Sequence, residues 1–299
     1  MADIRAEVRE FLSSRRARIT PDQAGLPAYG GNRRVAGLRR EEVAMLAGVS
    51  VDYYVRLERG NLAGASDSVL DALANTLQLD DAEREYLHDL ARASGPGVKR
   101  APKARPTVRP AVQQVLDAIS DAPAWVRNGR HDILAANRLA RALYSPVYDD
   151  PRRPVNTTRF AYLNPKAREF WRDYDQITHD AAAMLRLEAG RNPHDPDLIR
   201  LVGELSTQSE LFRRRWASRD VKFHRSGTKR LHHPVVGDLE LNFESMDLPS
   251  EPGLVLSVYT APANSASADA LKVLASWAAT HAAELTETEA AAAAGVDGT

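Results

Sequence analysis

The chain has no cysteine and no long apolar run. It can therefore form no disulfide and hold no thiolate nucleophile, a composition typical of proteins in a reducing cytoplasm. No apolar run approaches the ~20 residues that a membrane-spanning helix needs. The segment from Met1 to Arg16 alternates charged and apolar residues, unlike a signal peptide. We expect a cytoplasmic protein that is not embedded in a membrane.

Net charge is also absent, because 40 Lys and Arg residues balance 40 Asp and Glu residues. A chain of this kind that binds nucleic acid must segregate its charge. Between Ser13 and Arg40 there are seven arginines against one acidic residue, Asp22. Residues 61–94 carry seven acidic residues against two arginines. The sequence thus predicts a basic face and an acidic back.

Motifs of common catalytic sites are missing. The sequence contains no Walker loop, HExxH, Rossmann glycine pattern or nucleophile elbow. His232 and His233 are adjacent, but neighbours in a strand point to opposite faces, and the other six histidines lack ligand spacing. We expect no catalytic residue, no metal site and no cofactor.

Residues 37–60 predict two short helices joined by a tight turn. Val43, Leu46 and Ala47 follow the spacing i, i+3, i+4, which gives the first helix one apolar face. Gly48 follows as a left-handed C-cap, a conformation that glycine adopts at little cost.

The second helix of this pair begins at Ser50, whose hydroxyl is placed to cap it. Tyr54 and Leu57 form its inward stripe. This is the helix-turn-helix arrangement, in which the second helix enters the major groove of DNA. A plain helical hairpin used only for packing is the alternative, and the arginines nearby favour DNA.

Arg56 lies on the outward face of the second helix, where it could bond guanine O6 and N7 together. A phosphate contact or an ion pair with Asp52, four residues earlier, is the alternative. Val51 could touch a thymine methyl group, and Asp52 could accept from cytosine N4. Arg40 is the predicted phosphate clamp. The candidate DNA-binding residues are Arg33, Arg34, Arg39, Arg40, Ser50, Val51, Asp52, Tyr53 and Arg56.

At 299 residues the chain is long enough for two domains. We predict a domain of five helices over 1–94 and a linker with four prolines over 95–110. The linker's five basic residues suit either a solvated connection or a strap that contacts phosphates. A second domain is expected over 111–286 and a disordered tail over 287–299.

The second domain mixes helices and strands. Asn128-Gly129 between two short apolar runs is typical of a β-hairpin with a type I′ turn. A long helix is predicted over 166–189. Val221 and Phe223 predict a further strand, with a turn at Ser226-Gly227 and a return strand to His233. With two later strands this predicts a curved sheet under a helical cover, an α+β domain.

The first part of the chain resembles the Xre family of helix-turn-helix regulators at Arg40, Glu42, Ala44, Gly48-Val49-Ser50, Leu57, Glu58 and Gly60. A closer resemblance is to the MmyB-like regulators, through residues 37–44, 51–58, 69–73, 127–130, 203–206 and 225–230. It departs slightly, since Ala36 and Ala65 stand where proline is expected. The resemblance implies a lambda-repressor-like first domain and a PAS-like second domain that binds a small, fatty-acid-like effector.

Arg127, Arg225, Lys229 and Arg230 gather around the predicted hairpins. Charged strand edges that block edge pairing explain them most simply. The alternative is that one or two of them anchor the carboxylate of an acyl effector. The candidate ligand-binding residues are Trp125, Arg127, Asn137, Phe170, Trp171, Phe223, Arg225, Leu241 and Phe243.

Together these features predict a homodimeric transcription regulator that binds a double-stranded operator. Its second domain is either a small-molecule sensor or a protein-interaction platform, for example for RNA polymerase. A sizeable closed apolar cavity with one polar end would favour the sensor. A solid core beneath an exposed apolar patch would favour the platform.

Overall fold

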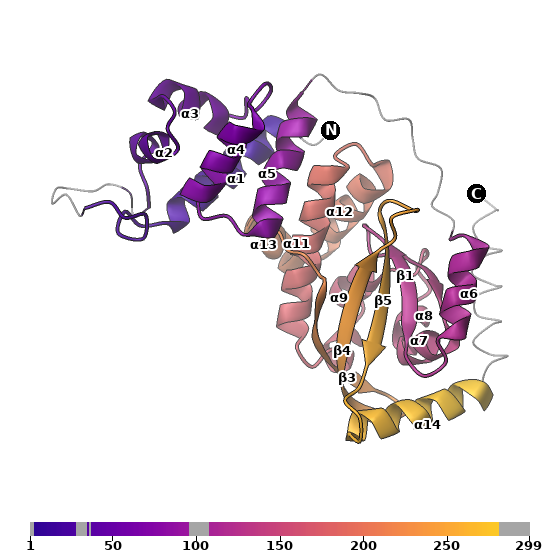
Figure 1. Ribbon diagram of the computed structural model, residues 1–299. Helices are drawn as coiled ribbons and strands as arrows, with labels where there is room; N and C mark the ends of the chain where they lie inside the picture. Colours follow the sequence, from indigo (N-terminus) through magenta and orange to yellow (C-terminus); the bar gives the residue numbers. More distant parts are fainter. Residues whose placement is uncertain (1–2, 28–34, 36, 96–107, 281–299) are drawn as a thin grey trace. The chain divides into compact units, whose positions relative to one another are not determined.

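The computed structural model describes residues 3–27, 35, 37–95 and 108–280 (Figure 1). The chain forms two compact units that interleave along the sequence. The first unit contains Met1–Pro102, Arg186–Arg200 and Arg215–Phe223. The second unit contains Lys103–Leu185, Leu201–Arg214 and His224–Thr299. Most of the predicted linker over 95–110, and all of the predicted tail over 287–299, lie outside the described residues.

The amino-terminal part of the first unit is all-helical, as predicted. Its helices are capped by the side chains expected at helix starts: the carboxylates of Asp3 and Asp80 and the hydroxyls of Ser50 and Ser66 accept backbone N–H groups. The helices are α1 (Ile4–Arg18), α2 (Arg40–Leu46), α3 (Val51–Glu58), α4 (Asp67–Thr76) and α5 (Asp81–Ser94).

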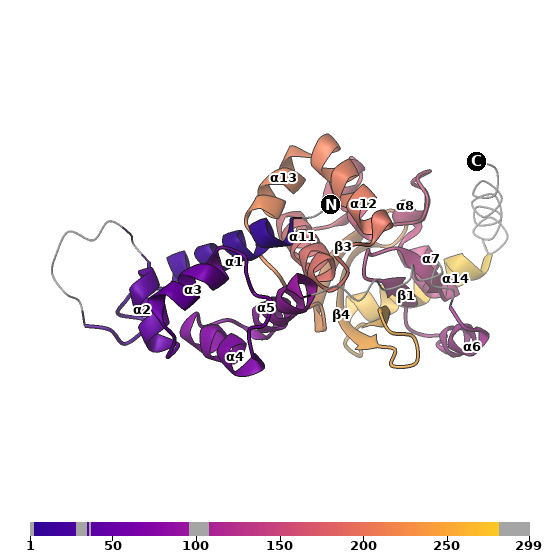
Figure 2. The same cartoon turned by 90° about the horizontal axis from the view of Figure 1, so that it is seen from above.

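Helix α1 packs against both α3 and α5 (Figure 2). Phe11 is fully buried between them, and its ring meets Tyr86 of α5 edge-on with centroids 5.1 Å apart. The same core includes two residues from much later in the chain, Leu187 and Val221. The first unit therefore needs part of the carboxy-terminal half to complete its hydrophobic core.

The turn between α2 and α3 depends on Gly48, which has φ of +66°. The Val49 N–H then donates to the Ala44 carbonyl at 2.9 Å and closes the turn. The predicted apolar face of α2 was partly wrong, because Leu46 is 38% exposed. The other two residues of the predicted face, Val43 and Ala47, are buried as expected, and Ala44 is fully buried as well.

The second unit contains a five-stranded antiparallel sheet in the order β2-β1-β5-β4-β3. The inward faces of β3 and β4 alternate with exposed residues, as in a sheet covered on one side. This confirms the predicted α+β, PAS-like class. The strands are β1 (Ala124–Asn128), β2 (Ile133–Ala136), β3 (Ser226–His233), β4 (Gly237–Asp247) and β5 (Leu254–Thr260).

Several helices pack against this sheet. α14 places Leu271, Leu274 and Ala278 in the same core as Trp125 and Leu241. The helices are α6 (Pro110–Ala118), α7 (Arg138–Leu143), α8 (Ser145–Tyr148), α9 (Thr157–Leu163), α10 (Ala167–Phe170), α11 (Tyr174–Arg191), α12 (Pro196–Gln208), α13 (Glu210–Ala217) and α14 (Ala266–Thr280). Among the described residues, no helix is long and apolar enough to span a membrane.

The predicted long helix over 166–189 is in fact two helices. Trp171 leaves the helical conformation and forms a β-bridge with Leu231, and the Arg172 N–H donates to the Arg230 carbonyl at 3.1 Å. Contact with a distant strand therefore separates α10 from α11, which local periodicity cannot reveal.

The strand predicted around Val221 and Phe223 was also wrong. Val221 is buried in the core of the first unit, and Phe223 packs against that core. Ser226 and Gly227 form no turn; they pair with Glu244 and Phe243 at the start of β3. The apolar alternation serves packing against helices rather than a sheet.

The predicted hairpin of β1 and β2 is present, but not its type I′ turn. Positive φ occurs at His131 (69°), not at Asn128 or Gly129. The Asn128 side-chain oxygen accepts the N–H groups of Arg130 and Asp132, each at 3.0 Å. This side-chain hydrogen bonding supports a longer loop than two residues.

Two glycine substitutions should separate backbone strain from steric clash. At Gly48 a Cβ would meet nothing within 4 Å, so Gly48→Ala should cost only the left-handed strain of about 1–2 kcal/mol. At Gly60 (φ +97°) a Cβ would lie 2.5 Å from the Arg5 carbonyl oxygen. Gly60→Ala should therefore lose about 2–5 kcal/mol, because a clash of about 1–3 kcal/mol adds to the same strain. Urea unfolding followed by circular dichroism measures both, and equal losses would contradict this account.

Candidate nucleic-acid interface and ligand cavity

The outward face of α3 presents a small set of exposed side chains. Val51 is 46% exposed, and Asp52 and Arg56 are exposed beside it. Tyr53 and Val55 are half-buried. The Ser50 hydroxyl accepts the Tyr53 N–H at 3.2 Å, so this residue caps the helix start. The face offers an apolar, an anionic and a cationic group within two turns.

Arg56 lies over the ring of Tyr53, with its guanidinium carbon 5.2 Å from the ring centroid. Within the described part of the chain its guanidinium makes no hydrogen bond or ion pair, so the predicted alternative of a pair with Asp52 is not formed. The stacking restricts the side chain without occupying its N–H donors. Those donors remain available for a base edge or a phosphate.

A buried carboxylate holds the two helices together beneath this face. Glu58, whose side chain is 2% exposed, accepts from Arg16 Nη2 at 2.8 Å and from Arg40 Nε at 2.9 Å. Arg16 also donates to the Leu38 carbonyl at 2.9 Å. A buried carboxylate needs such partners to offset its desolvation. Glu58 thus fixes α3 to α1 and to the start of α2.

The predicted phosphate clamp, Arg40, remains 53% exposed despite this pairing, because only its Nε contacts Glu58. Arg39 is the residue before α2, and its N–H donates to Glu42 Oε2 at 2.6 Å. Both side chains are exposed at the start of α2. Arg33 and Arg34, predicted to bind DNA, lie outside the described residues.

Sequence reasoning missed the role of Arg16 and Glu58. Arg16 was counted only within a basic stretch, although it is half-buried and structural. A signal was present, since Glu58 directly follows the inward residue Leu57 on a short helix. A charged residue on an inward face implies a buried partner of opposite charge.

The second unit contains a cavity of about 70 Å³ between the sheet, α9 and α11. Its walls are aromatic and apolar, with polar groups from β1, β3 and the loop after β1. The lining residues are Trp125, Arg127, His131, Tyr144, Thr157, Thr158, Ala161, Trp171, Ile177, Asp180, Ala181, Met184, His224, Lys229, Ser257 and Tyr259.

Two cationic side chains and one anionic side chain line this cavity. Arg127 and Lys229 face it together with Asp180, whose Oδ1 accepts from Gln176 Nε2 at 2.6 Å. His131 is buried, and this burial lowers the pKa of its imidazole well below the usual range, with further lowering by the charges of Arg127 and Lys229. His131 therefore adds no charge near neutral pH, and the two cations Arg127 and Lys229 outnumber the single carboxylate of Asp180 in the lining.

Aromatic rings form the opposite wall. The rings of Trp125 and Tyr259 lie with centroids 4.5 Å apart, and the hydroxyls of Tyr144 and Tyr259 are 2.9 Å apart. Trp171 is 4% exposed, and its indole N–H has no hydrogen-bond partner among the residues that the structure describes. An unpaired buried donor of this kind can be satisfied by a bound acceptor.

The predicted ligand residues are divided by the structure. Trp125, Arg127 and Trp171 line the cavity. Asn137 caps the start of α7 instead, with its Oδ1 accepting the Ala140 N–H at 2.8 Å. Four others do not line the cavity: Phe170, Leu241 and Phe243 belong to the core of the second unit, and Arg225 is exposed. Phe223 packs in the first unit.

Sequence reasoning did not place α11 at a cavity. Ile177, Ala181 and Met184 fall within the helix predicted over 166–189, and the side of α11 that carries them borders the cavity. His131 and Thr158 gave no signal, because their proximity depends on the loop after β1; His131 Nδ1 lies 2.6 Å from the Thr158 hydroxyl.

Comparison with protein families matches these two regions separately. Residues 14–87 match a helix-turn-helix domain model. Residues 108–274 match the model described as the MmyB-like transcription regulator ligand binding domain. A search of curated proteins found no match.

A helix-turn-helix with an exposed α3 face, followed by an α+β ligand-binding domain, defines a DNA-binding transcription regulator. The second match covers more than half of the chain. The protein belongs to the MmyB-like transcription regulators.

The buried histidine predicts an acid-dependent loss of stability. The unfolded chain binds a proton at His131 near pH 6.5, whereas the folded chain does so only at much lower pH, so the free energy of unfolding should fall as pH decreases below about 6.5. Burial lowers the pKa of His233 also, which adds to the slope in the same direction.

The variant His131→Asn isolates the contribution of His131, since asparagine tolerates the positive φ at this position. The slope of unfolding free energy against pH between 5 and 6.5 should decrease by up to about 1.4 kcal/mol per pH unit. Urea titrations at each pH measure it, and an unchanged slope would contradict the assignment.

Proposed function

We propose that this regulator recognises a specific operator through the outward face of α3 and that an acidic small molecule in the cavity of its second unit changes its affinity for DNA. The observation that carries the first part is Arg56, held over Tyr53 with its donors uncommitted among the described residues. Arginine on a recognition helix can bond guanine O6 and N7 together. Val51 and Asp52 lie beside it for adjacent base pairs.

Phosphate contacts would come from the residues at the start of α2. Arg39 and Arg40 are exposed there, and Glu58 fixes the base of the Arg40 side chain without covering it. Helix N-terminal amides nearby add partial positive charge. The acidic residues predicted on the back of the first unit pair with arginines of that unit, for example Asp71 with Arg84 at 3.1 Å.

The effector part rests on the chemistry of the cavity. Arg127 and Lys229 suit a carboxylate, and the Trp125, Tyr144 and Tyr259 rings suit an apolar body. A fatty-acid-like effector combines both features. Ligand pockets commonly hold about 300–1,000 Å³, so a long chain would have to displace side chains, whereas a short acid fits the 70 Å³ cavity more closely.

The small volume of the cavity is the observation that favours a second candidate function, a protein-interaction platform. A largely filled core would suit a protein-interaction platform, for example for RNA polymerase. The exposed large apolar residues of the described second unit are Val115, Val235, Met246 and Val273, each from a different part of the chain. No two of them share an element, and single exposed apolar residues are normal on a protein surface, which favours the sensor.

We further propose that the protein acts in the cytoplasm as a homodimer. Helix-turn-helix proteins bind half-sites about one helical turn apart, so a two-fold pair of α3 helices suits a palindromic operator. Sedimentation of the purified protein with and without operator tests this state.

Selection of bound DNA from a random pool should yield an operator, and two variants should then behave differently on it. Arg56→Ala should lose about 1–3 kcal/mol on the selected sequence and discriminate less at one base pair. Arg40→Ala should weaken binding to all sequences alike and lower the salt slope by about one. Arg84→Ala, on the acidic side, is the matched control and should bind normally. Equal loss of discrimination in the first two variants would contradict this division.

A series of straight-chain carboxylic acids from butyrate to myristate tests the effector class. One or more should raise the melting temperature, whereas the alcohol of equal length should not, because the charge-assisted bond to Arg127 is absent. Arg127→Gln should weaken binding by about 10-fold or more, whereas Arg225→Gln, outside the cavity, should not. No binding by any acid would favour the interaction platform.

A further inference from the structure

Helix α11 belongs to both compact units. Ile177, Asp180, Ala181 and Met184 of its first half line the cavity of the second unit. Its last residues, from Arg186 to Arg191, are part of the first unit. The helix is continuous over 18 residues. A displacement of its cavity wall therefore reaches residues that pack in the DNA-binding unit.

The far half of α11 meets α1 through buried charge. Arg186 is 1% exposed, and its Nη1 donates to Glu7. Its Nη2 donates to the Trp216 carbonyl, and its guanidinium carbon lies 4.0 Å from the Trp216 ring centroid. Glu7 also accepts from Arg219 and, at 2.7 Å, from the Tyr86 hydroxyl. Burial alone would raise the pKa of Glu7, but Arg186, Tyr86 and Arg219 together lower it.

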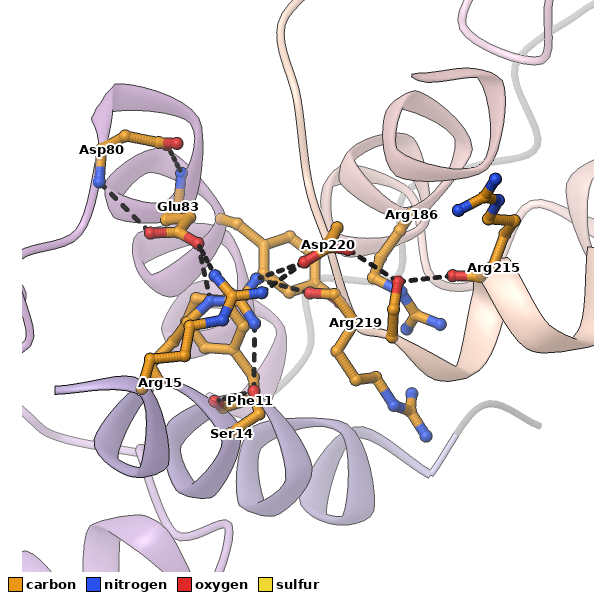
Figure 3. Close-up of polar contacts among 12 residues, drawn as sticks. Phe11, Ser14, Arg15, Asp80, Glu83, Arg186, Arg215, Arg219 and Asp220 are labelled. Atoms are coloured by element: carbon orange, nitrogen blue, oxygen red, sulfur yellow. Dashed lines mark hydrogen bonds and ion pairs between the residues drawn. The ribbon is translucent and has the colours of Figure 1, made fainter. Parts of the chain in front are cut away.

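A second set of charges holds the later segment about two turns further along α1 (Figure 3). Arg15 is 1% exposed and donates to the Arg219 carbonyl at 2.5 Å, while its Nε lies 2.7 Å from Glu83. Asp220 pairs with Arg18 of α1. Glu83 itself caps the start of α5 with Asp80. Residues 215–223 are therefore held by α1 and α5 together.

Close packing accompanies these ion pairs. Leu187 of α11 is buried in the core of the first unit. At Gly190 a Cβ would lie 2.4 Å from Cε2 of the Tyr86 ring. Helix α11 can therefore pack this closely on Tyr86 only with glycine at position 190. Tyr86 is the residue that also donates to Glu7. The contact of α11 with α1 and α5 thus has little tolerance for displacement.

Helix α1 carries this contact to the recognition helix. Glu7 lies near its start, whereas Arg16, near its end, donates to Glu58 at the end of α3. Buried ion pairs lose much of their stabilisation when their geometry changes. Movement of Arg186 would therefore carry α1 with it rather than break the pair with Glu7.

We propose that Glu7 is a positioning residue through which α11 transmits occupancy of the cavity to α1 and α3, and so sets the affinity for operator. The inference rests on the proposed operator binding and deepens it. Its test needs no identified effector, because a larger side chain introduced on the cavity wall can fill the cavity. Ala181, on the cavity wall of α11, is the position for it.

A double-mutant cycle on the full chain tests the proposal. Operator dissociation constants are measured for Ala181→Leu and Ala181→Phe, each with Glu7 intact and with Glu7→Gln. With Glu7 intact, the filled cavity should change the constant by about fivefold or more. With Glu7→Gln the change should fall below twofold. Asp71→Asn, an exposed partner of Arg84 in the same unit, is the control and should leave the full change in place.

Two results overturn the proposal: an equal change with and without Glu7, and no change in any folded filler with Glu7 intact. Ala161→Leu on α9 fills the same cavity and replaces Ala181 variants that fail to fold by circular dichroism. Gly190→Ala, which wedges α11 from Tyr86, should abolish the change as Glu7→Gln does. If the wild-type protein binds no selected operator, the proposed operator binding is wrong. That result is distinct from an operator-binding protein in which Glu7 has no effect on the change.

Discussion

The structure depends on the pairing of charges that it removes from water. Two guanidinium groups, of Arg15 and Arg186, and one carboxylate, of Glu58, are almost completely buried. Leaving any of them unpaired would cost about 3–5 kcal/mol, so each fixes the elements that supply its partners. Glu58 fixes the helix-turn-helix, and Arg15 and Arg186 fix the later segments to α1. The same helix therefore supports the DNA-binding face and receives α11.

The cavity follows a related rule. Its aromatic rings pack against one another, while Arg127, Lys229 and Asp180 introduce charge where the sheet meets α11. Charged groups at such a place make the core less stable than an apolar core would be, and they suit recognition of a ligand. Membership of the MmyB-like regulators assigns ligand binding to this domain, and this cavity is the site that we propose for the ligand.

Local signals predicted the five helices between Ile4 and Ser94 well. The caps at Ser50 and Asp80 and the glycine at 48 act on neighbouring residues, so their consequences follow from the chain itself. The errors occurred where a distant element decides. Trp171 leaves its helix to pair with Leu231, and Val221 packs against helices instead of joining the sheet. Of the candidate ligand residues, Trp125 and Arg127 of β1 and Trp171 after α10 line the cavity.

The sequence by itself determined the helix-turn-helix, its exposed α3 face and the α+β class, because periodicity, capping and turn residues act over a few positions. Only the tertiary structure decided which charges are buried together and which walls enclose a cavity. Glu7 and Arg186 are 179 residues apart along the chain. No local pattern relates two such residues, since their contact exists only once the helices that carry them have packed.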